Sequence, residues 1–479
     1  MSSIKQALVK TSGLLAALAA SENSNVNVVT TDTLVIGGGA GGAHAAVRLT
    51  DYGQDVILVE RESILGGAVD SFTDPTTGRT SDMGVGDFTD YGNVTGFFSR
   101  FNVPITHKPA SASSAAPRRF DFSTGQAITN YSGPSQADVH AALEQYAAVA
   151  EKYEDILVPG YWNFPNASDI PEDLLLNFGA FVEKYNISAA LPTIFQIAGA
   201  MGRVVDKEVL PVMRAFPAQT ARTVLGTQKS YVTVSGRNQD LYDAVGEFLG
   251  DKVYYNTQAI SSVRSDAGVA VTVQDINTGQ KTIIQASNLV LGIAPDPSKF
   301  SILDLDDTEL GVFSKFQYTR EHIFVMSCPS LAQTNTSLAN LPYSANDNTA
   351  THFPDYNFTG TISRVSANST LFHTAIVGDK FLDPESAKAK LQSDIQTLVG
   401  AHDLPGSSSE AQLEYHLVSD HGFMHARVTA DEYKAGFIQD LMALQGRRST
   451  WYTGSAFSAN WQTMLWEYNE ILVPKILGR

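Results

Sequence analysis

The sequence predicts an α/β fold in which a nucleotide-binding domain is interrupted by a second domain of mixed α+β structure. A short apolar strand at 33–36 is followed by a glycine-rich turn, a helix and a further strand. Apolar residues at three- and four-residue spacing predict helices at 135–154, 171–224 and 385–400. The segment 252–295 alternates β-branched with polar residues, which predicts strands that return to the first domain.

The glycine-rich turn has the spacing of a dinucleotide-binding fingerprint. In the stretch GGGAGG, Gly37, Gly39 and Gly42 occupy the glycine positions of the G-x-G-x-x-G pattern, with Ala40 and Gly41 between them. These glycines permit a tight turn, a close approach of the backbone to a pyrophosphate, and close packing of helix on strand. The helix N-terminus offers free N–H groups and a partial positive charge to phosphates. A Rossmann-like domain that binds a dinucleotide is therefore favoured over a glycine turn that binds nothing.

The second strand, DVILVE, ends in Glu60, where an acid hydrogen-bonds the ribose hydroxyls of a dinucleotide. The stretch VERESILGGAVDSF resembles the flavoprotein amine-oxidase superfamily, in which this acid precedes a basic residue and a Gly-Gly pair. Arg61, Gly66 and Gly67 occupy those places, whereas Ala68 stands where the superfamily often has arginine. The resemblance implies non-covalently bound FAD in a glutathione-reductase-like domain rather than a nicotinamide cofactor.

Two later stretches resemble the same superfamily. VYYNTQAISSV is similar to the strand whose backbone contacts the adenine, which places Ile260 there. STWYTGSAFSANWQTMLWEYN places Gly454 and Ser455 in a turn before an aromatic-rich helix. The resemblance implies that this turn lies beside the flavin ring, where a helix N-terminus stabilises charge on the reduced ring.

Over residues 30–479 the chain resembles a fungal group of FAD-dependent, amine-oxidase-like proteins related to β-cyclopiazonate dehydrogenase. The motifs KYEDILVPGYWNFP, HGFMHARV and GRRSTWYTGSAF carry the resemblance, together with ILGGAVDSFTDPTTGRTSDMGVGDFTDYGN. It implies oxidation of a small organic substrate, with residues 109–224 and 301–414 forming a substrate or cap domain. The FAD-binding domain is then expected in three pieces, at 31–108, 225–300 and 415–479.

Four residues are candidates for the chemistry. Asp87 lies in a stretch expected near the flavin ring, and Tyr452 is expected to form an aromatic wall for the substrate. His421 and His425 lie four residues apart, which places them on one face of a helix or a strand, as a proton acceptor or substrate contact. The alternatives are turn formation or capping for Asp87 and a structural role for the two histidines. A metal site is not expected, because further ligands are not identifiable.

Composition argues against several classes of partner, and the resemblance implies a small-molecule substrate. The formal charge of −17 argues against nucleic acid and anionic membranes, and no apolar run approaches the roughly 20 residues that a membrane span needs. The single cysteine, Cys328, excludes an intramolecular disulfide and a CxxC redox pair. No second G-x-G-x-x-G occurs, so no NAD(P)H site is expected, and electrons leave to dioxygen or another acceptor.

The N-terminus is consistent with export. Lysines at 5 and 10 precede a short apolar run and a small-residue sequence, so residues 1–30 form a candidate signal peptide. The alternative is a frayed amphipathic helix on a cytoplasmic protein. N-x-S/T sequons favour a secreted glycoprotein. These sequons stand at Asn93, Asn130, Asn166, Asn186, Asn335, Asn357 and Asn368.

The sequence therefore predicts an FAD-dependent oxidoreductase. The expected reaction removes hydride from a C–N or C–C bond of a small organic metabolite. A redox-neutral isomerase of an unsaturated substrate and a non-catalytic FAD-binding protein are the alternatives that the residues leave open.

Overall fold

The computed structural model describes residues 26–479 apart from 109–115, 335, 348–352, 403 and 405–408. Most of the candidate signal peptide, and the sequon at Asn335, lie outside the described residues. The first strand begins at Asn27, so the nucleotide-binding domain starts inside the segment 1–30. None of the described helices is both long and apolar enough to cross a membrane.

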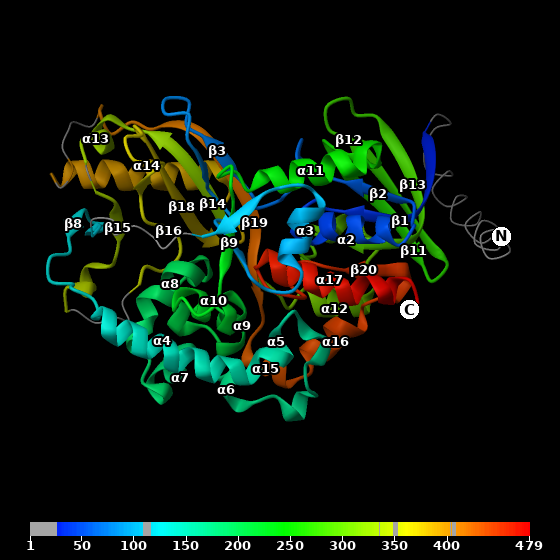
Figure 1. Ribbon diagram of the computed structural model, residues 1–479, viewed down its shortest axis with the longest axis horizontal. Coiled ribbons are helices and arrows are strands. Elements are labelled where there is room, and N and C mark those ends of the chain that lie inside the picture. Colours follow the sequence, from blue (N-terminus) through cyan, green and yellow to red (C-terminus); the bar gives the residue numbers. More distant parts are fainter. Residues whose placement is uncertain (1–25, 109–115, 335, 348–352, 403, 405–408) are drawn as a thin grey trace.

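The nucleotide-binding domain is built on a seven-stranded sheet, on the right of Figure 1. Its central strands are parallel and its β11 and β12 are antiparallel additions at one edge. The strands are β1 (Asn27–Ile36), β2 (Val56–Val59), β10 (Val253–Tyr254), β11 (Thr257–Ser265), β12 (Gly268–Asp275), β13 (Lys281–Leu291) and β20 (Thr450–Tyr452). All of β2 and the last four residues of β1 are buried, as expected for parallel strands with helices on both faces. The predicted Rossmann-like α/β class is confirmed.

Helices from both ends of the chain pack on this sheet. The helix α2 (Ala40–Asp51) follows the glycine turn and contacts the C-terminal α17 (Gln462–Ile476). The remaining helices of the domain are α3 (Val94–Arg100), α11 (Gln239–Leu249), α12 (Asp307–Phe313), α15 (Ala430–Lys434) and α16 (Phe437–Ala443). Short strands link this domain to the second one: β3 (Ser71–Thr73), β4 (Thr80–Asp82), β5 (Phe88–Thr89), β6 (Ile105–His107) and β9 (Ser230–Thr233).

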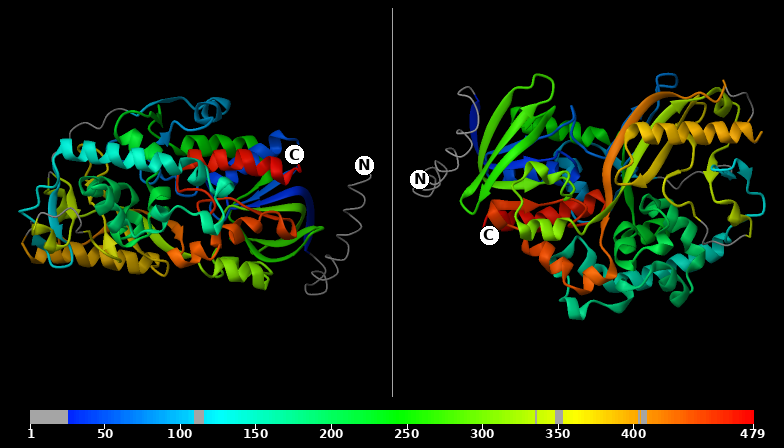
Figure 2. Two further views of the ribbon diagram at one scale, coloured as in Figure 1. Left: turned by 90° about the horizontal axis from the view of Figure 1, so that it is seen from below. Right: turned by 180° about the vertical axis from the view of Figure 1, so that it is seen from behind.

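The second domain combines an antiparallel sheet with a helical layer, as Figures 1 and 2 show. The sheet is formed by β14 (Gln317–Ser327), β16 (Phe358–Thr359), β17 (Ser363–Arg364), β18 (Leu371–Asp379) and β19 (Glu414–Arg427), and α14 (Pro384–Gly400) packs on it. Three small strands, β7 (Arg118–Asp121), β8 (Gln126–Ala127) and β15 (Leu338–Asn340), and α13 (Pro329–Ala332) lie at its far end. The helical layer consists of α4 (Gln136–Ala150), α5 (Glu154–Leu157), α6 (Glu172–Leu175), α7 (Phe178–Tyr185), α8 (Leu191–Ala198), α9 (Val209–Ala215) and α10 (Ala218–Val224).

The structure changes two of the predicted boundaries. The strand β19 belongs to the second sheet rather than to an FAD-binding piece that begins at 415, because it pairs with β14 along nearly its whole length. Conversely, α12 packs on the first domain, where Glu309 pairs with Arg264 of β11. The helical segment 171–224 is several short helices, because prolines fall at the first turn of α8 and at the N-cap of α10.

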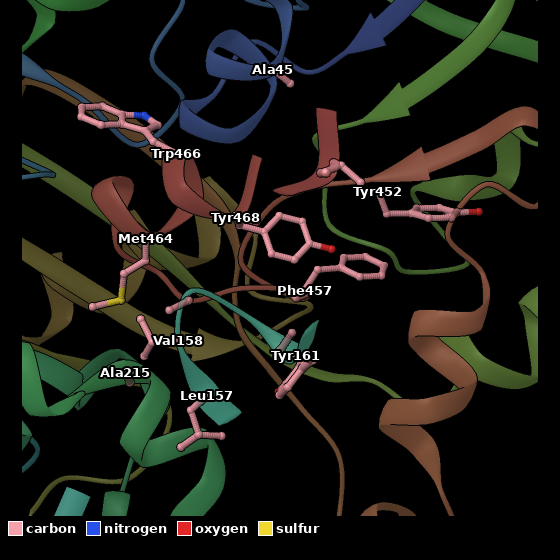
Figure 3. Packing of buried hydrophobic residues seen from close by; sticks show 14 of the residues in the cluster. Ala45, Leu157, Val158, Tyr161, Ala215, Tyr452, Phe457, Met464, Trp466 and Tyr468 are labelled. Carbon is pink, nitrogen blue, oxygen red and sulfur yellow. The ribbon is translucent and has the colours of Figure 1, made fainter. Parts of the chain in front are cut away.

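The helix α17 joins the two domains. Figure 3 shows Met464 and Trp466 of α17 above Leu157, Val158 and Ala215 of the helical layer, all within one buried cluster. This packing fixes the N-terminus of α17 at the boundary between the domains. The candidate site lies at the same boundary.

Candidate functional site

The fingerprint glycines form a cradle that side chains would obstruct. Gly37 has φ +98°, and a Cβ on Gly42 would lie 1.9 Å from the carbonyl oxygen of Gly37. Gly39 is the N-cap of α2, and no side chain caps the free N–H groups of the first turn. These donors and the helix dipole suit the phosphates of a dinucleotide. The cradle therefore fits the pyrophosphate of FAD.

The Gly-Gly loop lies directly against this cradle. The N–H of Gly66 donates to the carbonyl of Gly38 at 2.9 Å, and a Cβ on Gly67 would lie 3.0 Å from the Cα of Gly39. Residues 39 and 66 also form an isolated parallel bridge. The structure thus brings together two glycine motifs that the sequence separates by more than 20 residues.

Gly39→Ala should release FAD without unfolding the protein. The nearest neighbour of the added Cβ is the Cα of Gly67 at 3.7 Å, an ordinary contact, but the methyl group occupies the gap that the pyrophosphate needs. We expect FAD affinity to fall at least about tenfold, as for overpacking of a tight site. The measurement is flavin absorbance per protein after gel filtration. Gly311→Ala, which has no neighbour within 4 Å, is the control and should retain FAD.

Glu60 is buried at the end of β2. Its Oε2 accepts from the N–H of Gly38 at 2.6 Å, and its Oε1 accepts from the N–H of Glu62 at 2.9 Å. Burial raises the pKa of Glu60, against the opposing effect of these N–H donors. The carboxylate is therefore held beside the glycine turn, as a ribose-binding acid requires. Arg61 is instead exposed and pairs with Glu62 at 2.8 Å.

The other predicted cofactor contacts lie on the same edge of the domain. Ile260 is the unpaired residue of a bulge in β11, where the pairing with β12 skips from Ala259 to Ser261. A bulge leaves backbone groups free to meet a ligand such as adenine. A Cβ on Gly41 would lie 3.3 Å from the nitrogen of Gly454, so the C-terminal turn touches the fingerprint.

The first turn of α17 carries N–H donors that no N-cap side chain satisfies. Its N-cap, Trp461, makes no capping hydrogen bond through its side chain, and the Oγ1 of Thr463 is buried without a partner among the described residues. Gln462 lines a cavity between the two domains. A carbonyl group carrying partial negative charge fits these donors. Bound FAD would supply carbonyl groups of this kind on its flavin ring, so the turn fits the ring side of the cofactor that the C-terminal motif implies.

The cavity has a volume of about 410 Å³ and lies between the Gly-Gly loop, α17 and the second domain. One wall comes from Ala68 and the segment 83–87, including the predicted Asp87. A second wall carries the predicted His421 and His425 together with Glu321 of β14. The third is largely apolar and comes from the helical layer: Ile197, Ala200, Ala215, Thr220, Thr223 and Val224.

His421 lies between two carboxylates and is nearly buried, with 3% of its side chain exposed. Its Nε2 is 3.0 Å from Asp70 Oδ2, and its Nδ1 is 3.2 Å from Glu321 Oε2. Burial lowers the pKa of His421, but the hydrogen bonds and charges of Asp70 and Glu321 outweigh it and raise that pKa to about 9. His421 is therefore an imidazolium that donates to both carboxylates. It ties the loop after Gly67 to the second sheet.

His425 is a neutral imidazole. Burial lowers its pKa to about 4, and Arg427 and Arg214 add to this effect while Glu321 opposes it. The Asn460 amide lies 3.0 Å from Nδ1, and a donor at that nitrogen leaves the hydrogen on Nε2. The backbone of His425 has φ +52°, an uncommon conformation for a residue with a side chain, and such residues gather at functional sites.

The other two predicted catalytic residues differ in position. Asp87 lines the cavity and pairs with Lys108 at 2.8 Å, near the exposed side chains of Ile197 and Val224. Tyr452 lies elsewhere: its hydroxyl donates to Glu309 at 3.0 Å, and Figure 3 shows this hydroxyl directed away from Met464 and Ala215. The prediction that places Tyr452 at the substrate is therefore not supported by the structure, because its hydrogen bond is used within the first domain.

Sequence analysis missed Glu321 and Asp70. Both touch His421, but they come from different strands and loops, and only the register of β14 against β19 brings Glu321 to the cavity. The sequence gives no clear signal for Glu321, because it stands in QYTREHIFVMS between Arg320 and His322, inside a run of charged and polar residues. Among the described residues, no three His, Cys, Asp or Glu side chains gather in a way that could hold a metal ion.

The stability of the protein should decrease between pH 6.5 and 9. The pKa of His421 is raised by folding from 6.5 to about 9, so its contribution is complete below pH 6.5 and is lost as the pH rises through 9. We expect the free energy of unfolding to fall by up to about 3 kcal/mol over this range. Denaturant titrations at several pH values measure this fall. In His421→Asn the fall should be much smaller, and an equal fall would contradict the assignment.

Comparisons with known proteins agree with this architecture. A family model described as an NAD(P)-binding Rossmann-like domain matches residues 35–101. The chain is 30% identical to the FAD-dependent oxidoreductase dpasF of Apiospora sacchari, over 99% of both chains. It is 28% identical to the FAD-dependent oxidoreductase pigF of Monascus ruber, over 94% of this chain and 93% of that one. It is 27% identical to the beta-cyclopiazonate dehydrogenase of Aspergillus flavus, over 96% of both chains.

Solved structures share the fold. The CLA-producing fatty acid isomerase from P. acnes superposes with a TM-score of 0.68 at 19% identity, over 93% of this chain and 98% of that one. Putrescine oxidase bound to putrescine superposes with a TM-score of 0.59 at 13% identity, over 94% and 100%. The predicted FAD cofactor and oxidoreductase class are confirmed by the full-length relatives. The chain belongs to the family of FAD-dependent oxidoreductases that these fungal relatives represent.

Proposed function

We propose that this enzyme removes hydride from a C–N or C–C bond of a small organic molecule that binds in the 410 Å³ cavity. The observation that carries the proposal is the position of this cavity. It opens between the segments expected to hold the flavin ring, namely Ala68 and the first turn of α17, and a wall that bears Glu321 and His425. When bound, FAD supplies the two-electron acceptor. The protein residues bind and orient the substrate and exclude water.

The charges of the cavity favour a substrate with a basic or hydrogen-donating nitrogen. Glu321 and His421 line the cavity, and Asp70 pairs with His421 from behind it, so this cluster carries one net negative charge. Asp87 and Lys108, which also line the cavity, neutralise each other. Burial raises the pKa of Glu321, but the hydrogen bond from His421 outweighs this and lowers it. The carboxylate thus stays ionised and attracts a cation or an N–H donor. A substrate carboxylate would meet repulsion there.

The outer part of the cavity suits an apolar group. Ile197 and Val224 are exposed apolar side chains on the helical layer, and both line the cavity together with Ala200. Burying them against a substrate contributes about 25 cal/mol per Å² of apolar surface. The proposed substrate is therefore amphipathic, with its nitrogen toward Glu321 and its apolar part toward Ile197 and Val224.

Anaerobic flavin bleaching tests the proposal. The FAD-loaded protein is mixed without oxygen with primary and secondary amines, alkaloids and unsaturated acids, including n-alkylamines and n-alkanoic acids of matched length. We expect bleaching by at least one amine or alkaloid and none by the acid of matched length. Hydrogen peroxide on readmission of air identifies dioxygen as the acceptor. Product formation without bleaching or any acceptor would show a redox-neutral isomerase instead, and an FAD that no compound reduces would contradict the proposal.

Cys328 supports non-covalent binding of the cofactor. It lies in the core beneath the second sheet, with Phe324, Met326 and Leu331, and burial raises the pKa of its thiol. A buried, protonated thiol does not act as a nucleophile. FAD should therefore be released by mild acid precipitation of the protein, and it should be found in the supernatant.

A further inference from the structure

Arg214 of α9 is a buried cation beside the C-terminal turn. Only 5% of the residue is exposed. Its guanidinium donates to the carbonyl oxygens of Ser455 and Ser458, and at 2.5 Å to the hydroxyl of Tyr161, whose ring lies 4.5 Å away. A side chain of the helical layer thus reaches across the domain boundary to the turn that precedes α17.

Within the described part of the chain, no carboxylate pairs with Arg214. Its hydrogen-bond partners are two carbonyl oxygens and a phenol, and its Nε is buried without a partner. The titratable groups that sense its charge are His425 and the tyrosines Tyr161, Tyr433 and Tyr468. All are uncharged at neutral pH, because burial lowers the pKa of His425 and raises those of the tyrosines.

A buried charge without an opposite charge is costly, by several kcal/mol even after the surroundings relax. Proteins keep such a charge where a ligand or a reacting group brings the missing partner. A small void of about 10 Å³ lies beside Arg214, lined by His425, Ser455 and Asn460, of which His425 and Asn460 also line the main cavity. The charge of Arg214 is therefore separated from the main cavity by only one layer of uncharged groups.

We propose that Arg214 supplies the positive charge that stabilises the reduced state of bound FAD and so raises its reduction potential. Transfer of a hydride moves two electrons and one proton to FAD, which therefore gains one negative charge, while the substrate loses the same hydride. Arg214 lies against the turn that precedes α17, and its charge and the first turn of that helix both favour this negative charge. Arg214 acts through electrostatics, as a positioning residue and not as a proton donor.

The inference rests on FAD binding and not on the identity of the substrate. The test is the reduction potential of bound FAD, measured by slow anaerobic reduction with dithionite beside a reference dye. Arg214→Met should weaken the binding of reduced FAD, relative to oxidised FAD, by at least tenfold. This change lowers the reduction potential by about 30 mV for a two-electron couple. Arg214→Lys should recover most of the wild-type potential. Tyr161→Phe removes a hydrogen bond but keeps the charge of Arg214. It should therefore change the ratio of the affinities for reduced and oxidised FAD less than twofold.

A potential in Arg214→Met equal to that of the wild type would overturn the inference. If that variant does not fold, Arg214→Gln replaces it, because its amide still donates to the carbonyl of Ser455 or Ser458 without the charge. The inference would also be overturned if Tyr161→Phe lowered the reduction potential as much as the variants that remove the charge, because packing would then explain the effect. The dye measurement needs no substrate. Failure of the bleaching experiment therefore affects only the proposed function, and an unchanged potential affects only Arg214.

Discussion

Replacing Glu321 with glutamine should lower kcat/KM by roughly 100-fold or more while leaving the FAD content unchanged. The carboxylate lines the cavity and accepts from His421 at 3.2 Å. In the proposed function it provides the negative charge that attracts the nitrogen of the substrate. Glutamine has nearly the same shape but no charge, so packing is preserved while electrostatic attraction and the capacity to accept a proton are lost.

This prediction is measured with a substrate from the bleaching panel, by stopped-flow reduction of the flavin. Glu385→Gln, an exposed side chain at the first turn of α14, is the matched control and should retain wild-type rates. A second readout is binding: the variant should lose its preference for an n-alkylamine over the alkanoic acid of the same length. Unchanged kcat/KM in Glu321→Gln would show that the substrate does not approach this wall.

The second large effect concerns stability. Glu309→Gln should destabilise the protein by about 3–5 kcal/mol, because the buried Arg264 then keeps only the partly exposed Asp304, at 3.0 Å, as a counter-charge. Both side chains are 0% exposed, and the guanidinium meets the carboxylate in two hydrogen bonds of 2.7 and 2.8 Å. Burial raises the pKa of Glu309, but pairing with Arg264 outweighs it and lowers that pKa. The pair joins α12 to β11 in the first domain.

Urea titration of the variant against the wild type measures this loss. In Glu385→Gln, which breaks an exposed pair with Lys388, the change should stay below about 1 kcal/mol. The double variant Arg264→Met with Glu309→Leu should recover most of the lost stability, because it removes both buried charges together. If Glu309→Gln alone is as stable as the wild type, other groups compensate for the lost charge of Glu309, and the prediction is wrong.

The cofactor side of the site was predictable from sequence because its chemistry is local. The glycine turn before α2 matches the pyrophosphate of the cofactor, and Glu60 at the end of β2 matches its ribose. The structure adds only that Gly39 and Gly67 face each other.

The substrate side was less predictable because it depends on contacts between distant segments. Glu321 reaches His421 only through the pairing of β14 with β19, and Asp70 reaches it from the loop after Gly67. No periodicity in the sequence specifies that register across 100 residues. Tyr452 was predicted at the substrate but lies away from it. The strand β20 pairs with β13, and the hydroxyl of Tyr452 donates to Glu309.

In the proposed function, substrate meets flavin in the cavity of about 410 Å³ between the two domains. The most direct test is anaerobic bleaching, by substrate, of the flavin in the Ala200→Trp variant. Ala200 lines the apolar wall, and an indole there fills much of the cavity. We predict full FAD content and flavin reduction by the substrate that is at least about 100-fold slower, with dithionite reduction unaffected. Bleaching at the wild-type rate in a variant that keeps its FAD would show that the substrate does not bind in this cavity.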